Sequence, residues 1–182
     1  MLPDKHVKQM EKLESRKSIY RKISASVIFL LSVFVIGPVV HELSHMVVLE
    51  SINCEYILNW GLNINGIHGS VRPVCVPNNY QLIAFYSVGY LSTAVAGGFL
   101  SFTSLKNRFD DSLKRINYTS LGTGLLVSTA ISLSLVGDMN NLAEILEIGV
   151  LQTQIFTVGF FLAISATVMR TLQVAWDDNS ER

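Results

Sequence analysis

The chain has 182 residues, of which 49% are hydrophobic and 15% are charged, and its formal net charge is zero. Because average soluble domains carry about 25% charged residues, this composition indicates a small membrane protein with a single compact bundle. The neutral balance excludes the basic footprint of a nucleic-acid-binding protein, and the two cysteines are too few for a disulfide-dense scaffold.

The first 22 residues form a charged arm ahead of the first apolar segment. Seven Lys and Arg residues lie in this arm, against three acidic residues. We interpret 1–22 as a basic, partly helical arm that ends at the membrane surface. Contact with anionic lipid and simple solvation are both compatible with it.

Four apolar segments are predicted to span the membrane, since about 20 apolar residues cross a bilayer. The first contains Gly37-Pro38, and because Pro38 cannot donate to the Phe34 carbonyl, we expect a kink there. The sequence thus predicts an all-α membrane protein with a single domain over 23–176 and a polar tail at 177–182. The four helices are expected at about 23–49, 80–105, 118–136 and 150–176.

A β-hairpin is predicted over about 55–75, between the first two spans. Apolar and polar residues alternate from Leu58 to Asn65, which is the period of a strand. Asn65-Gly66 is typical of a two-residue type I′ turn, and such a turn pairs Ile64 with Ile67. That register brings Cys54 within two positions of facing Cys75. A disulfide is possible if the loop lies outside the cytoplasm, and the sequence leaves this open.

The first span carries His41-Glu42-Leu43-Ser44-His45, an H-E-x-x-H motif. Positions i and i+4 share one face of a helix, so His41 and His45 can aim two imidazoles at one metal ion. Glu42 lies about 100° round the helix and could take a proton from water as a general base. Polar groups inside a membrane helix usually serve a function. The alternative is that both histidines only bond to neighbouring helices.

A catalytic zinc site usually has three protein ligands, so a third must come from elsewhere in the chain. Asp138 is our choice, because it ends the third span and is expected at the same depth as the two histidines. Glu144 is the main competitor, and an exposed place on a short interfacial helix is its alternative interpretation. Asn140 or Asn141 could donate a hydrogen bond to an oxyanion, although Asn140 is also expected to cap the following helix.

The positive charges of the loops predict the orientation. Seven Lys and Arg residues precede the first span, four lie between the second and third, one lies in the hairpin loop, and none lies between the third and fourth. The positive-inside rule therefore places the N-terminus and the 106–117 loop in the cytoplasm. The metal site is then expected in the opposite half of the membrane.

Over about 35–141 the chain resembles the site-2 protease family of intramembrane zinc metalloproteases. The resemblance rests on the H-E-x-x-H motif in a membrane helix, the strand-forming loop directly after it, a helix rich in small residues, and Asp138 near the end of the next helix. Members commonly have Asp-Gly where this chain has Asp138-Met139, and often Gly-Pro where it has Gly89-Tyr90.

The resemblance implies a zinc-dependent membrane endopeptidase that cleaves a transmembrane segment of another protein within the lipid bilayer. In that interpretation Glu42 is catalytic, and His41, His45 and Asp138 bind one Zn²⁺. Two other classes stay open: a metal permease or metal-sensing protein that uses His41 and His45, and a non-catalytic membrane scaffold. The second and fourth predicted spans contain no carboxylate or histidine to pass an ion along, which argues against a permease.

Overall fold

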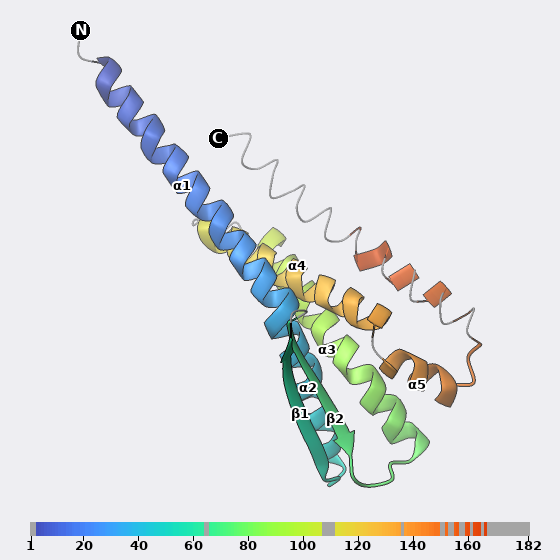
Figure 1. The fold of residues 1–182 in the computed structure, drawn as a ribbon. Coiled ribbons are helices and arrows are strands. Elements are labelled where there is room, and N and C mark those ends of the chain that lie inside the picture. Colours follow the sequence, from blue (N-terminus) through green and yellow to red (C-terminus); the bar gives the residue numbers. More distant parts are fainter. Residues whose placement is uncertain are drawn as a thin grey trace.

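The computed structural model describes residues 3–63, 66–106, 112–135 and 137–149, together with nine isolated positions between 152 and 166. It is mostly helical, with one small antiparallel sheet after the first long helix (Figure 1). The elements in chain order are α1 Pro3–Leu31, η1 Ser32–Ile36, α2 Gly37–Ser51, β1 Tyr56–Asn63, β2 Gly66–Pro73, α3 Asn79–Lys106, α4 Ser112–Leu135 and α5 Gly137–Ile145.

Within the described residues, two helices are long and apolar enough to cross a membrane, Leu13–Ser51 and Asn79–Ser104. They contain the predicted spans 23–49 and 80–105 almost entirely. α4 covers most of the third predicted span, and it makes a third crossing if α4 and α5 are counted as one bent span. The segment 150–176 lies mostly outside the described residues, although its described positions are helical. The tail 177–182 also lies outside them, so a bundle of four spans stays a prediction.

The arm 1–22 continues into the first span without a break from Pro3 onward. The kink expected at Pro38 stays a prediction, since Leu13–Ser51 continues as one helix. Directly before Gly37-Pro38 that helix contains η1, a π-helical turn in which the Gly37 N–H donates to the Ser32 carbonyl. Such turns accommodate a residue that cannot donate a regular helical hydrogen bond. Gly37 itself packs against the Ser128 side chain of α4, where a Cβ would not fit.

Helices α3 and α4 cross closely through small and hydroxylated residues, as helices do where no water drives their association. A Cβ on Gly97 would lie 2.9 Å from the Gly122 carbonyl oxygen, so only glycine allows this approach. The Thr129 hydroxyl donates to Thr93 at 2.8 Å across the same interface. On the other side of α3, exposed apolar residues follow a helical stripe that suits contact with lipid: Leu91, Val95, Phe99 and Phe102.

The β-hairpin is confirmed, but its predicted register is wrong. Asn63 pairs with Gly66 and Leu62 with Ile67, so the connection is one position earlier than the Asn-Gly signal indicated. The partner of each residue therefore changes by two from the predicted pairing.

A disulfide between Cys54 and Cys75 closes the base of the hairpin. Tyr56 pairs with Pro73, and the Val74 N–H donates to the Glu55 carbonyl at 2.8 Å. Continuing that ladder by one more pair places the two cysteines opposite each other. The covalent link at the base of the hairpin therefore agrees with the observed register.

We predict that Gly97→Ala destabilises the protein and that Gly98→Ala, the neighbouring change, does not. An added Cβ at Gly97 meets backbone atoms of Gly122 and Leu126, whereas at Gly98 nothing lies within 4 Å. Overpacking of this kind typically costs about 1–3 kcal/mol. Thermal unfolding of the purified variants in one detergent measures the difference. Equal melting temperatures would contradict the close helix crossing.

Candidate metal centre

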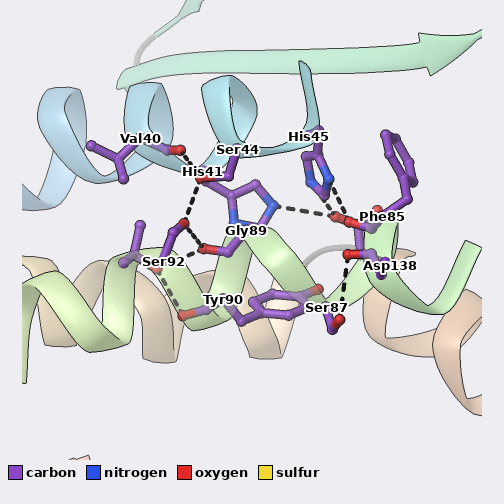
Figure 2. A network of polar contacts seen from close by, with 12 residues as sticks. Val40, His41, Ser44, His45, Phe85, Ser87, Gly89, Tyr90, Ser92 and Asp138 are labelled. Atoms are coloured by element: carbon purple, nitrogen blue, oxygen red, sulfur yellow. Dashed lines mark hydrogen bonds and ion pairs between the residues drawn. The ribbon is translucent and has the colours of Figure 1, made fainter. Parts of the chain in front are cut away.

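Two histidines of α2 and one aspartate of α5 meet at a single point (Figure 2). The His41 Nε2 atom lies 3.2 Å from Asp138 Oδ2, and His45 Nε2 lies 3.1 Å from the same oxygen. The two histidines are 4% and 2% exposed, and the Asp138 side chain is 19% exposed. One ligand atom from each residue lies within 4.8 Å of the other two, and the group could hold a metal ion.

The backbone of α3 orients His45. Its Nδ1 lies 2.7 Å from the Phe85 carbonyl oxygen, and because a carbonyl only accepts, Nδ1 must carry the proton. The Nε2 lone pair then faces the Asp138 carboxylate, which is also an acceptor. Two acceptors at 3.1 Å repel unless a second proton or a metal ion lies between them. The nitrogen and oxygen lone pairs are therefore arranged to bind a cation. A backbone carbonyl that accepts from the other ring nitrogen of a histidine is a common support for a metal ligand.

His41 is held by close packing against α3. A Cβ on Gly89 would lie 2.5 Å from His41 Nδ1 and 2.7 Å from Nε2, so the ring occupies the space that any other residue would fill. The Tyr90 ring contacts His41 edge-on, with centroids 5.1 Å apart. One turn along, Ser44 donates to Ser92 at 2.6 Å and fastens α2 to α3.

Asp138 reaches the histidines because α5 begins directly after α4. It lies in the first turn of α5, whose first residue is Gly137, and an acidic side chain there is favoured by the helix dipole. A long helix followed at once by a second helix thus brings a residue 93 positions after His45 into contact with it. The contact of Asp138 with both histidines agrees with the choice made from the sequence, while the depth of the three residues in a membrane stays a prediction.

Glu42 lies beside the three-residue group without belonging to it. Its half-buried side chain points at β2, where the backbone N–H of Val71 lies near the carboxylate. A Cβ on Gly69 would lie 2.6 Å from Glu42 Cγ. The hairpin therefore holds the glutamate next to the histidines, a contact that the sequence did not predict.

Several other candidates lie away from the centre. Glu144 and Glu147 are exposed, and neither belongs to the metal-ligating group. Asn140 and Asn141 are exposed within α5. The expectation that Asn140 caps a following helix is wrong, because α5 already begins at Gly137.

The sequence also missed three residues of α3 that surround the ligands. Phe85 acts through its backbone carbonyl, for which no side-chain pattern exists. Gly89 and Ser92 share one face of α3 and could have been found by looking for small residues at helical spacing opposite the motif.

Comparisons with protein-family models, with curated proteins and with solved structures found no match. The resemblance to site-2 proteases therefore rests on the motif residues alone. What the centre does has to be argued from its chemistry.

We predict that Gly89→Ala lowers the affinity for metal at least about tenfold, because the new methyl group displaces the His41 ring and second-shell losses of this kind typically cost 10- to 100-fold. Gly98→Ala, on the same helix with open space around it, is the matched control and should bind metal like the wild type. Titration of apo protein with Zn²⁺ against a competing chelator measures both. A Gly89→Ala variant with wild-type affinity would show that His41 is not a ligand.

Proposed function

We propose that this protein is an intramembrane zinc endopeptidase, which hydrolyses a peptide bond in or near a transmembrane segment of another protein. The observation that carries the proposal is the meeting of His41, His45 and Asp138, with Glu42 beside them but outside the group. Metal ligands with an adjacent, non-ligating carboxylate are what metal-assisted hydrolysis requires.

Zinc suits the three donors, since two imidazoles, one carboxylate and an open fourth position are a common catalytic zinc arrangement. When bound, the ion would polarise the scissile carbonyl and lower the pKa of a water molecule toward about 7. His45 is already in the tautomer that such binding needs, because its Nδ1 donates to the Phe85 carbonyl.

Glu42 moves the protons of the reaction. As general base it takes one proton from the water whose oxygen attacks the carbonyl carbon of the peptide. It then delivers that proton to the nitrogen as the C–N bond breaks, which leaves a carboxylic acid and an amine. The contacts with Val71 and Gly69 of β2 keep the carboxylate in place for both transfers.

The proposed arrangement in the membrane is a bundle of four transmembrane helices with the arm 1–22 in the cytoplasm. Two independent features support this orientation. Most of the positive charges lie in the arm and in the 106–117 loop, and such charges favour the cytoplasmic side of a membrane. The Cys54–Cys75 disulfide lies at the opposite end of the first span, and disulfides persist outside the reducing cytoplasm.

The substrate segment must unwind for cleavage, because helical hydrogen bonds shield its carbonyl groups. Strand addition to the hairpin would hold such an unwound peptide. Because β2 packs on α2 at Gly69, β1 is the outer strand of the two. Ile57, Leu58 and Trp60 of β1 are exposed and apolar, which suits a substrate that arrives from the bilayer.

A metal permease or sensor is the alternative class for the same histidines. A permease passes its ion between successive sites, yet His41, His45 and Asp138 are the sole group of three metal-ligating side chains within the described part of the chain. A non-catalytic scaffold would not need two buried histidines with their nitrogens turned to one carboxylate.

We predict that Glu42→Gln lowers cleavage of a co-expressed membrane substrate by about 10²- to 10⁴-fold, the usual contribution of a general base, and leaves the metal content unchanged. The amide keeps the shape of the side chain but cannot accept the proton. Glu50→Gln, an exposed glutamate near the end of the same helix, is the matched control. Equal cleavage by wild type and Glu42→Gln would remove Glu42 from the mechanism, and metal transport that survives Glu42→Gln would favour the permease.

A further inference from the structure

Three buried side-chain polar atoms have no hydrogen-bond partner among the described residues: His41 Nδ1, Tyr90 Oη and Ser101 Oγ. Such atoms are rare in folded proteins and call for an explanation. Ser101 lies at the close crossing of α3 and α4, where its hydroxyl meets Gly122. His41 Nδ1 is part of a candidate metal ligand, and Gly89 covers it. The Tyr90 hydroxyl is the remaining case.

The Tyr90 side chain is 5% exposed and is fixed by its neighbours. Its ring meets His41 at 67°, edge-on, with centroids 5.1 Å apart. Figure 2 shows the phenol lying beneath the two histidines with its oxygen directed toward the Asp138 side of the cluster. The ring is therefore held in one orientation against the metal centre.

The Tyr90 oxygen lies near two residues of the proposed catalytic site. The charges that act on it are those of Asp138 and Glu42, and the backbone N–H of Met139 lies near it. The Met139 N–H can only donate to the phenol oxygen. No acceptor for the phenol proton lies within hydrogen-bonding geometry among the described residues.

Other side-chain donors near the centre are already engaged. The Ser44 hydroxyl is hydrogen-bonded to the Val40 carbonyl and to the Ser92 hydroxyl, and Thr93 donates to the Gly89 carbonyl. Asn140 and Asn141, the donors expected from the sequence, are exposed on α5. Tyr86, one turn earlier on α3, is half-buried and lies edge-on to Phe85 rather than to a histidine. Among the described residues, Tyr90 is thus the fully buried donor that packs against a histidine and has no acceptor.

We propose that Tyr90 is a further catalytic residue, which donates a hydrogen bond to the scissile carbonyl oxygen as that oxygen becomes an oxyanion. This inference rests on the proposed function and deepens it. When the water oxygen bonds to the carbonyl carbon, an electron pair moves onto the carbonyl oxygen, and the Tyr90 O–H stabilises it without giving up its proton. When the C–N bond breaks, the pair returns to the C=O bond and the hydrogen bond weakens.

A tyrosine suits this task. The phenol O–H of a tyrosine is a hydrogen-bond donor in neutral solution. Because the ring is already packed against His41, the donor needs no rearrangement during the reaction, and preorganised donors of this kind contribute most to oxyanion stabilisation. Many site-2 proteases have Gly-Pro where this chain has Gly89-Tyr90, so the donor would be a particular feature of this protein.

The test is Tyr90→Phe, which removes one oxygen and keeps the ring on His41. We predict that kcat falls about 10²- to 10³-fold, the cost of losing one oxyanion donor. The KM, the zinc content and the melting temperature should stay at wild-type values. Tyr80→Phe is the control, since Tyr80 lies in the first turn of α3 and its side chain is exposed.

A binding measurement separates this inference from the activity itself. In the full-length, zinc-loaded Glu42→Gln protein we would measure two apolar peptides, one with a phosphinic group that imitates the tetrahedral anion and one with a thiol that has no oxygen to receive the bond. Tyr90→Phe should weaken phosphinic binding about 10- to 100-fold, the range for a hydrogen bond to a charged group, and leave thiol binding unchanged.

Each other outcome overturns the inference. Equal phosphinic binding with and without the hydroxyl would make Tyr90 a packing residue, and equal weakening of both peptides, or loss of zinc, would make its role structural. If the wild type cleaves and Tyr90→Phe cleaves equally well, the inference fails while the proposed function stands. If the wild type neither cleaves nor binds zinc, the proposed function fails first.

Discussion

The hydrogen bond between His45 Nδ1 and the Phe85 carbonyl is the constraint on which the centre depends. It determines which nitrogen carries the proton, and so it turns the Nε2 lone pair toward Asp138. In an apolar bundle, buried acceptors that face one another are costly unless a cation joins them. The contacts between α2 and α3 follow from this requirement. Gly89 makes room for His41, and the Ser44–Ser92 bond holds the two helices at that distance.

The hairpin connects this centre to the far end of the first span. Its base is closed by the Cys54–Cys75 bond, the ladder continues from that bond through Tyr56 and Pro73, and β2 then reaches Glu42 at Gly69 and Val71. The helix α2 therefore carries the proposed base, and the strand β2 packs against its side chain. In the proposed mechanism, the small sheet beside the membrane helix has two roles. Its strand β2 packs against the general base, and its strand β1 binds the substrate peptide.

Much of the centre could be predicted from the sequence. Helical spacing is enough to place His41 and His45 on one face, and the lengths of the apolar segments are enough to choose Asp138 over Glu144. The register of the hairpin was not predictable in the same way. The local preference of Asn65-Gly66 for a turn competes with the disulfide between Cys54 and Cys75, which lie 21 residues apart in sequence. The role of Phe85 could not be predicted either, because every residue has a backbone carbonyl and no residue type indicates its use. The orientation of Tyr90 depends on how α3 packs against His41, which is a tertiary contact.

The most direct test of the account is the metal content of the purified protein, measured for the wild type, Asp138→Ala and Glu144→Ala. The account predicts about one zinc ion per chain in the wild type and in Glu144→Ala, and a large loss in Asp138→Ala because two histidines alone leave the site one protein ligand short. A wild type without metal, or an Asp138→Ala variant that keeps its zinc, would contradict it.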